Sequence, residues 1–468
     1  RLLAGAQQIH DGDGRQDESW SALQAADHET REKWSITRML NQLTLNGVGP
    51  AQKLVIDFKP RLNFLTGDNG LGKSFVLDIA WWALTRTWAR EIMAMPRQDA
   101  FESSIGYSYT SSKDQFEWSS QFDHATQQWS VKQGRPAIPG VVIYAGVDGS
   151  FSVWDPARNY WKNDKGEVTA PNRPRSFDFN PEEVWSGLRT SDGKTQLCKG
   201  LLHDWVSWQE AKKPAFDDLV KVLDALSPSG VEKIQPGTPM RVGDSVQDLP
   251  SLRMPYGQDV PLIHASAGMR RIAALAYLLV WTWREHQLAC ERFRVNSARE
   301  IIFLVDEIEC HLHPQWQRRI VPALLNVMNA LTGLRDVPVQ LLAATHSPLV
   351  LASVEPTFNP EQDCIWDFDL VGHEVEARLY PWSRKGDVNA WLASGVFNLK
   401  EPVSVQAEEA LGLARAFLQT TAKANNALST EQITQMQNID NQLRASLGEL
   451  DPFWIRWSQF RERLEARS

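Results

Sequence analysis

Cysteines and long apolar runs are both scarce in this sequence. It has four cysteines in 468 residues, and no two of them form a C-x-x-C pair. This spacing argues against a zinc site and against a disulfide framework. No apolar run reaches the ~18 residues that a membrane-spanning helix needs, and the N-terminus lacks the charged-then-apolar pattern of a signal peptide. We therefore expect a cytoplasmic protein that has no membrane partner.

The sequence also has no excess of positive charge. Its 49 Lys and Arg residues are outnumbered by 57 Asp and Glu residues, and the formal net charge is -8. The field of the whole molecule therefore does not favour coating of nucleic acid, although a local basic groove stays open. The 20 Trp residues fit core and interface packing best, and a nucleic-acid stacking surface is the alternative.

A glycine-rich loop is the clearest motif in the chain. Residues 67–74 read GDNGLGKS, between a strand-like segment and a helical segment, which is the context of a phosphate-binding P-loop. In such a loop, backbone N–H groups and the helix N-terminus bind phosphate oxygens, the lysine contacts the β- and γ-phosphates, and the hydroxyl ligates Mg²⁺. We therefore predict the cofactors ATP and Mg²⁺, with Lys73 as a catalytic residue and Ser74 as a metal ligand. The predicted nucleotide contacts are Gly67, Asn69, Gly70, Gly72, Lys73, Ser74 and Phe75.

Two carboxylates follow a second apolar strand. The run IIFLV at 301–305 ends in Asp306 and Glu307. In a P-loop enzyme, Asp306 would hold Mg²⁺ through water, and Glu307 would polarise the attacking water as general base. The separation between Ser74 and Asp306 is much longer than in compact kinases or AAA+ motors, so a large segment is inserted between them.

Two further motifs flank Asp306 at similar distances. Ser266 and Gly268 stand directly before a helical segment, and His346 directly follows an apolar strand. This order resembles that of ABC ATPases. The resemblance implies that Ser266 and Gly268 are signature residues, which bind the γ-phosphate held by the other subunit, and that His346 is a catalytic switch that contacts the γ-phosphate in its own subunit. A hydroxyl and free N–H groups at a helix start also bind anions well.

Two assignments stay open at this point. The run at 309–314 reads ECHLHP and places two His and a Cys close together, so a zinc site is a minor alternative to the dimer-contacting loop that the ABC resemblance implies. A glutamine switch is expected between the P-loop and the signature. Three glutamines are candidates for it: Gln98, Gln115 and Gln121.

Three passages carry a closer resemblance. They read ITRMLNQLTLNG…LVIDFKPRLNFLTGDNGLGKS, VDEIECHLHP and AATHSP, and they are similar to RecF/SMC-like ABC ATPases. No heptad array occurs, so the chain most resembles the coiled-coil-free ATPases of bacterial anti-phage systems, including those of Septu-type systems and of PARIS. This resemblance implies a homodimer or higher homo-oligomer and a separate effector, an HNH-type nuclease encoded nearby. We expect no nuclease in this chain, because no Asp-x-Asp pair of a Toprim domain follows Asp387.

The predicted fold class is α/β, with an ABC-type P-loop ATPase head. The head would comprise residues 34–95 and 255–380, around a Trp-rich, mixed α+β insertion at 96–254. A helical C-terminal module at 381–468 would serve docking or oligomerisation, or would pack onto the ATPase core. Residues 1–33 form a polar N-terminal segment that we expect to be weakly ordered.

The predicted function is an Mg²⁺-dependent ATPase that dimerises around ATP and gates an effector nuclease. One alternative is a RecF-like ATPase of DNA repair, which would bind DNA through a basic surface. Its candidate contacts are Arg270, Arg271, Arg318 and Arg319. A third hypothesis is a scaffold that hydrolyses little ATP and uses it as a structural ligand.

Overall fold

The computed structural model describes residues 39–110, 115–130, 139–159, 174–228, 233–244, 246–298, 300–333, 337–397, 399–421 and 429–465. The chain divides into two compact units between Arg384 and Lys385. The predicted polar segment at 1–33 lies outside the described residues. Within these ranges, no helix is both long and apolar enough to cross a lipid bilayer.

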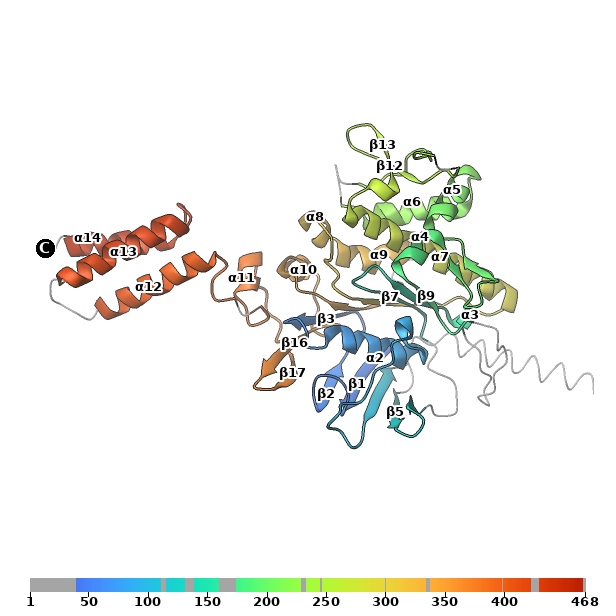
Figure 1. Cartoon of the computed structure of the whole chain (residues 1–468), viewed down its shortest axis with the longest axis horizontal. Helices are drawn as coiled ribbons and strands as arrows, with labels where there is room; N and C mark the ends of the chain where they lie inside the picture. Colours follow the sequence, from blue (N-terminus) through green and yellow to red (C-terminus); the bar gives the residue numbers. More distant parts are fainter. Residues whose placement is uncertain are drawn as a thin grey trace, which may run out of the picture. The chain divides into compact units, whose positions relative to one another are not determined.

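A mixed sheet of eight described strands forms the centre of the first unit (Figure 1), in the order β17-β16-β3-β15-β14-β7-β8-β9. The five neighbours from β16 to β7 run parallel, and the strands at both edges are antiparallel. The strands are β3 (Leu62–Gly67), β7 (Val141–Ala145), β8 (Phe151–Trp154), β9 (Phe177–Phe179), β14 (Ile301–Val305), β15 (Val339–Ala344), β16 (Asp363–Val371) and β17 (Glu374–Leu379). All residues of β7, β14 and β15 are buried, because helices and a second sheet cover both faces. The predicted α/β class is confirmed.

The second sheet is antiparallel and has the order β2-β1-β4-β5-β6. Its strands are β1 (Met39–Asn46), β2 (Lys53–Asp57), β4 (Ser104–Thr110), β5 (Gln115–Asp123) and β6 (Gln128–Trp129). Helix α2 (Lys73–Thr85) contacts β1 of this sheet and β7, β14 and β15 of the central sheet. One hydrophobic core therefore joins both sheets through α2.

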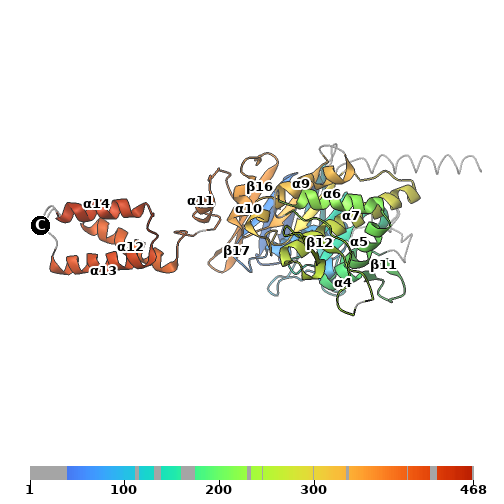
Figure 2. The same ribbon diagram turned by 90° about the horizontal axis from the view of Figure 1, so that it is seen from above.

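Helices α7 (Ala267–Phe293) and α9 (Ile320–Thr332) cover the other face of the central sheet, and α6 (Pro214–Leu226) packs on these two helices (Figures 1 and 2). The helical part of the chain before α9 is interrupted, because α8 (Pro314–Gln317) ends before α9 begins. Pro322 explains the break, because its ring would clash with the carbonyl of Arg318 in a continuous helix. The smaller elements are η1 (Ala89–Glu91), α3 (Pro156–Asn159), α4 (Pro181–Ser186), β10 (Leu188–Arg189), β11 (Gln196–Cys198), α5 (Leu201–Glu210), β12 (Ser251–Arg253), β13 (Asp259–Pro261), η2 (Leu262–His264) and α10 (Pro348–Val354).

The segment predicted as an insertion, 96–254, differs from that expectation. Strand β4 pairs with β1 along its length, and β7 pairs with β14. The segment therefore supplies strands to both sheets of the first unit. The local composition could not reveal this, because these pairings join residues far apart in the chain.

The described tryptophans are all buried or half-buried. Trp81, Trp154 and Trp205 have no measurable exposure, and Trp82 stacks on Trp88 with ring centroids 5.3 Å apart. Among the described residues, the exposed large apolar side chains include no tryptophan. The packing interpretation is therefore supported, and the nucleic-acid stacking surface is not.

The second unit, Lys385–Ser468, has a hydrophobic core of its own. Its helices are α11 (Val388–Leu392), α12 (Val405–Thr421), α13 (Thr430–Ser446) and α14 (Phe453–Glu465). Trp457 of α14 is fully buried, and its indole N–H donates to the carboxylate of Asp440 in α13 at 2.9 Å. The unit begins four residues after the predicted boundary at 381, and its helices pack on one another.

Candidate functional site

The P-loop joins β3 to α2 at the carboxyl edge of the central sheet. Gly67, Gly70 and Gly72 have positive φ angles of 117°, 79° and 92°, a conformation that residues with a Cβ rarely adopt. Gly67 is also limited by space, because a Cβ there would overlap the carbonyl oxygen of Phe368 in β16. A Cβ at Gly70 would meet nothing within 4 Å. The loop therefore packs closely against β16 at Gly67 and has free space beside Gly70.

Lys73 lies across this loop. Its ammonium donates to the carbonyl oxygens of Gly67 at 2.9 Å and Asp68 at 2.7 Å. Burial lowers the pKa of Lys73, and the charges of Asp306 and Glu307 act in the opposite direction. The amine therefore lies in the field of the acidic pair, where phosphate oxygens could replace its loop carbonyl acceptors.

Ser74 and Asp306 are in direct contact. The Ser74 hydroxyl donates to the Asp306 carboxylate at 2.9 Å. Burial raises the pKa of Asp306, although the hydrogen bond from Ser74 opposes this shift. Hydroxyl and carboxylate oxygens are ligands that Mg²⁺ prefers, and a divalent cation favours the ionised carboxylate that burial disfavours. The residues present therefore fit the predicted magnesium site.

Glu307 and His346 lie on neighbouring loops beside this pair. Strands β14 and β15 are parallel, with Val305 opposite Ala343, so the loops that follow them share one edge of the sheet. Glu307 has a φ of 46°, and such left-handed backbone in a residue with a long side chain is typical of functional sites. The structure thus brings both predicted catalytic side chains to the edge that carries the P-loop.

Ser266 and Gly268 lie at the start of α7. The Ser266 hydroxyl oxygen caps the helix by accepting a hydrogen bond from the N–H of Met269 at 3.3 Å, and the Ser266 side chain is exposed. A Cβ added to Gly268 would lie 2.7 Å from the carbonyl oxygen of His311. Gly268 therefore packs on the loop that follows Asp306. Within one chain, the loop after Asp306 therefore links the predicted signature residues to the acidic pair.

The remaining predicted nucleotide contacts are at the tip of the loop and the start of α2. Asn69 is exposed. Phe75 is half-buried, and its ring lies where a Cβ at Gly49 would be, in the turn between β1 and β2. Its side chain therefore packs on this turn, and its backbone is at the helix N-terminus, where anions bind.

Two arginines near the site were not assigned to it from the sequence. Arg271 was proposed as a DNA contact, but its guanidinium donates to the backbone carbonyls of Val147 at 3.1 Å and Asp306 at 3.4 Å. Its position three residues after Gly268, on the same helix face, was a usable signal. Arg90 pairs with Asp78 at 2.8 Å and lies over the ring of Tyr144. It follows an irregular turn, so no periodic pattern marks it.

The glutamine switch is not found at the predicted places. Gln121 lies exposed on β5 of the second sheet, and Gln98 is exposed in a loop, while Gln115 begins β5. On the side of β14 away from β15, the neighbouring strand is β7, and it is followed by Gly146 and Asp148. The glutamine candidates thus fall outside the loop that lies beside Asp306.

The run at 309–314 does not form a metal site. Within the described residues, no three His, Cys, Asp or Glu side chains converge as metal ligands would. Glu309 instead accepts hydrogen bonds from Thr345 and from the backbone of His346. The minor zinc alternative is therefore not supported.

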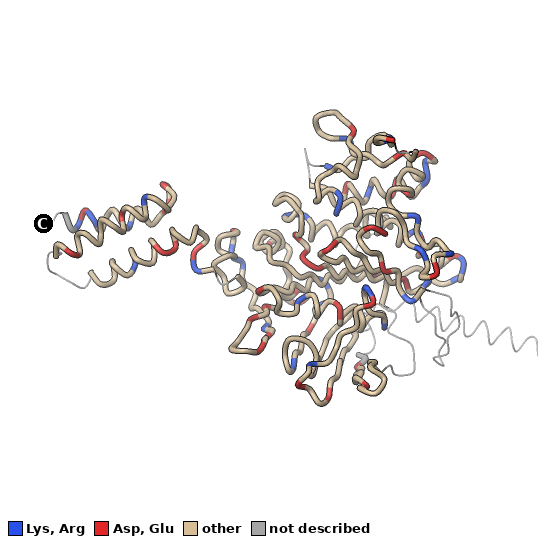
Figure 3. The backbone as a smooth tube through the Cα atoms, in the orientation of Figure 1, with Lys and Arg blue, Asp and Glu red and all other residues tan. Residues whose placement is uncertain are grey.

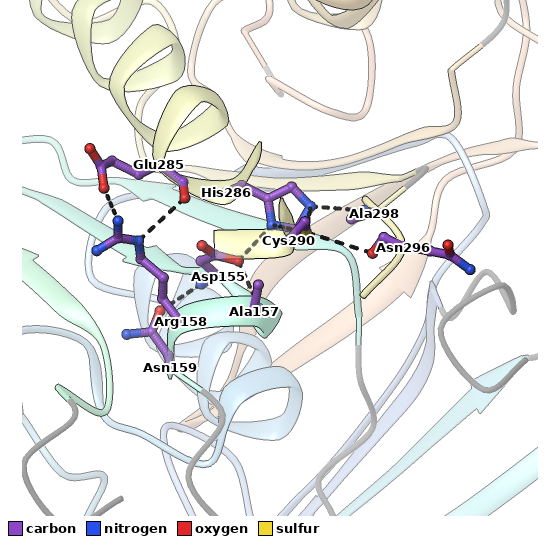
Figure 4. Close-up of polar contacts among 9 residues, drawn as sticks. All are labelled: Asp155, Ala157, Arg158, Asn159, Glu285, His286, Cys290, Asn296 and Ala298. Carbon is purple, nitrogen blue, oxygen red and sulfur yellow. Dashed lines mark hydrogen bonds and ion pairs between the residues drawn. The ribbon is translucent and has the colours of Figure 1, made fainter. Parts of the chain in front are cut away.

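A second buried polar cluster resembles a Cys-His-Asp triad (Figure 4). His286 Nδ1 lies 2.7 Å from Asp155, and its Nε2 accepts a hydrogen bond from the N–H of Ala298 at 2.8 Å. This bond occupies the ring nitrogen that a nucleophilic Cys290 would need as its base. Burial raises the pKa of the Cys290 thiol to about 12. The cluster therefore pins the end of α7 to the segment before β14 and has no catalytic geometry.

Two family models match successive parts of the chain. Residues 42–135, which include the P-loop, match a family described as an AAA domain. Residues 148–352, which include the acidic pair, match a family described as "AAA domain, putative AbiEii toxin, Type IV TA system".

The chain is also similar to curated proteins, at low identity. It is 34% identical to the Retron Vc95 probable ATPase of Vibrio cholerae over 119 residues, which are 25% of this chain and 20% of that protein. It is 18% identical to the Septu protein PtuA of Bacillus thuringiensis over 334 residues, 66% of this chain and 72% of that protein. The Retron Ec83 probable ATPase of Escherichia coli is 28% identical over 100 residues, 21% of this chain and 15% of that protein. The matched parts thus span less than a quarter of each retron protein.

Solved structures with partial likeness include the SMC head domain from Thermotoga maritima. Its TM-score is 0.36 at 12% identity, over 74% of this chain and all of that chain. The recombination mediator protein RecF-ATPrS of the RecFOR pathway has a TM-score of 0.36 at 11% identity, over 73% of this chain and 98% of that chain.

The strand order and the site are those expected of a P-loop ATPase of the ABC type. The P-loop, the acidic pair and His346 follow adjacent parallel strands, and the helix that carries Ser266 and Gly268 at its start packs on the loop after the acidic pair. The Septu and retron relatives bear out the predicted similarity to ATPases of bacterial defence systems.

Proposed function

We propose that this chain is an Mg²⁺-dependent ATPase that dimerises around ATP and gates a separate effector in anti-phage defence. The observation that carries the enzymatic part is the 2.9 Å contact between Ser74 and Asp306, with Lys73 and Glu307 beside it. This arrangement places an amine, a hydroxyl and two carboxylates at the N-terminus of α2, where phosphates bind.

The side chains have distinct roles in this hypothesis. Ser74 and Asp306 would hold Mg²⁺, which when bound neutralises charge on the β- and γ-phosphates. Lys73 would bind the same phosphates after it leaves the loop carbonyls. Glu307 would accept a proton from the water that attacks the γ-phosphorus, as the bond to the ADP oxygen breaks. His346 would contact the γ-phosphate from the neighbouring loop.

The positions of Ser266 and Gly268 support the proposed dimer. The atoms nearest to a Cβ at Gly268 belong to His311 and Leu312 of its own chain, while Ser266 is exposed at the N-terminus of a long helix. A second copy, related by two-fold symmetry, would present Ser266 and Gly268 to the γ-phosphate on this P-loop. ATP would then join the two copies, and hydrolysis would release them.

The experiment measures phosphate release and molar mass together, with MgATP, with ATP and EDTA, and without nucleotide. We expect Mg²⁺-dependent turnover and a doubling of mass with a slowly hydrolysed ATP analogue. An unchanged mass with turnover present would contradict the dimer and leave the ATPase assignment intact.

The effector part rests on the Septu and retron relatives. The second unit, Lys385–Ser468, is the candidate docking element, because it has its own core and is distinct from the ATPase unit. The partner would be an HNH-type nuclease encoded nearby. Co-purification with the neighbouring gene product tests this, and a shortened chain that ends at Arg384 should lose the partner.

The RecF-like alternative has less support. Arg271 is engaged with two backbone carbonyls inside the chain, and Figure 3 shows basic and acidic positions interspersed along the described backbone. Arg270 and Arg318 are exposed. ATP-stimulated DNA binding that weakens steeply with salt would favour this function. The scaffold hypothesis would be favoured by retained ATP with negligible turnover.

A further inference from the structure

The loop after β14 and the loop after β15 are joined by a glutamate that has no role in the site described above. Glu309 accepts a hydrogen bond from the Thr345 hydroxyl at 2.7 Å and another from the backbone N–H of His346 at 2.5 Å. Thr345 is fully buried and Glu309 is half-buried. The two carboxylate oxygens of Glu309 thus hold two successive residues, Thr345 and the predicted switch residue His346.

A second set of hydrogen bonds connects the same two loops. The Ser347 hydroxyl donates to the side-chain oxygen of Gln317 at 2.7 Å, and the Gln317 amide donates to the carbonyl of Leu312 at 2.9 Å. The Ser347 N–H in turn donates to the Thr345 hydroxyl oxygen at 3.1 Å. The loop that carries Glu307 is therefore tied to residues 345–347 on both sides of His346.

The bonds differ in strength. Hydrogen bonds to an ionised carboxylate are about twice as strong as those between neutral groups, and both hydrogen bonds that Glu309 accepts are short. The loop that Glu309 anchors also contains two left-handed residues, Glu307 and His311. Strained backbone of this kind persists only where surrounding contacts fix it.

We infer that Glu309 is a positioning residue that holds His346 in register with Glu307 for attack on one γ-phosphate. It acts through the backbone of His346 and makes no contact with substrate. The inference rests on the proposed ATPase function, and it adds a residue on which the geometry of hydrolysis depends. A displacement of about 1 Å in a reacting group can cost on the order of 100-fold in rate, so loss of this clamp should act on turnover.

Kinetics give the first test. Glu309→Ala should lower kcat by about 10- to 100-fold, with KM for ATP within about threefold, because the P-loop is untouched. Glu309→Gln keeps an oxygen acceptor and should lose less. The matched control is Glu361→Ala, which removes an exposed glutamate in a turn. Thr345→Val removes one of the two bonds to Glu309 together with the acceptor of the Ser347 N–H, and it serves if Glu309→Ala does not fold.

A double-mutant cycle separates positioning from general damage. In a His346→Ala background, Glu309→Ala should cause no more than about a threefold further loss of kcat, because the group it positions is absent. A full additional loss there, or a wild-type kcat in Glu309→Ala alone, would overturn the inference.

Amide hydrogen exchange reports on the clamp even without turnover. Glu309→Ala should accelerate exchange in the peptide that contains His346, while Glu361→Ala should not. If the wild-type protein hydrolyses no ATP, the proposed function fails, and the exchange result still decides whether Glu309 holds this loop. Unchanged exchange in Glu309→Ala would refute the clamp by itself.

Discussion

The hydroxyl of Ser74 and the carboxylate of Asp306 are 2.9 Å apart, although 232 positions separate them in the chain. The contact forms because β3 and β14 are separated only by β15 in the central sheet. Parallel strands deliver the residues at their carboxyl ends to a common edge, where ligands of α/β folds bind. The pair is the basis for assigning the nucleotide site.

Lys73→Ala should weaken ATP binding about 10- to 100-fold, because a hydrogen bond to a charged group contributes about 1.5–3 kcal/mol. Titration calorimetry with ATP measures this. The thermal midpoint should not fall, since burial disfavours the ammonium that the change removes. Unaltered ATP affinity would contradict the assignment of the P-loop.

Glu307→Gln should retain ATP binding and lose at least about 100-fold in kcat, which is within the range that general-base catalysis contributes. The closed dimer should accumulate with ATP itself, since hydrolysis no longer releases it. Light scattering during size-exclusion chromatography detects the dimer. Wild-type turnover in this variant would remove Glu307 from its role.

Gly268→Ala should abolish the ATP-dependent dimer while ATP binding changes by less than about threefold. The added methyl group would lie 2.7 Å from the carbonyl oxygen of His311, so the N-terminus of α7 must shift. Gly412→Ala is the matched control, because Gly412 is exposed in α12 with open space around it. A wild-type dimer in Gly268→Ala would show that this contact does not position the signature residues.

Asp367→Asn should stabilise the protein at neutral pH. Burial, with the charge of Asp369, raises the pKa of Asp367 to about 6 from its ordinary value of 3.8. The folded state then binds this proton more tightly than the unfolded chain, so the group lowers stability increasingly as pH rises from about 4 to about 6. After discounting for solvent, the gain at pH 7.5 should be about 1 kcal/mol.

Urea unfolding at pH 7.5 and pH 5 checks the sign of this effect. The stability gain of Asp367→Asn should be larger at the higher pH. An equal gain at both values would mean that the raised pKa is not its cause.

The sequence predicted the site best where a single strand and the residues directly after it supply the functional side chains. The apolar runs of β3, β14 and β15 predicted buried parallel strands, and the polar residues that follow them predicted the edge of the sheet at which they meet. Periodicity sufficed because these strands are buried on both faces. Periodicity could not show that β4 belongs to the second sheet and β7 to the central sheet, because strand partners depend on contacts distant in sequence.

The residues that support the site were harder to predict. Glu309 reads as one more acidic residue after Asp306, and only the pairing of β14 with β15 brings it to Thr345 and His346. Arg271 reads as a basic surface residue, but a half-buried guanidinium can still meet backbone carbonyls within its own chain. Such roles depend on loop geometry that has no sequence period.

The most direct test of the composite site is complementation between two inactive variants. Lys73→Ala removes the P-loop contact, and Ser266→Arg should block the signature contact that the other subunit would receive. Either variant alone should be inactive. In an equal mixture, half of the dimers should be mixed, and each should contain one intact site, so activity should return to about a quarter of the wild-type value. Full activity of Ser266→Arg alone, or no recovery in a mixture in which mixed dimers form, would contradict an ATP site shared between two subunits.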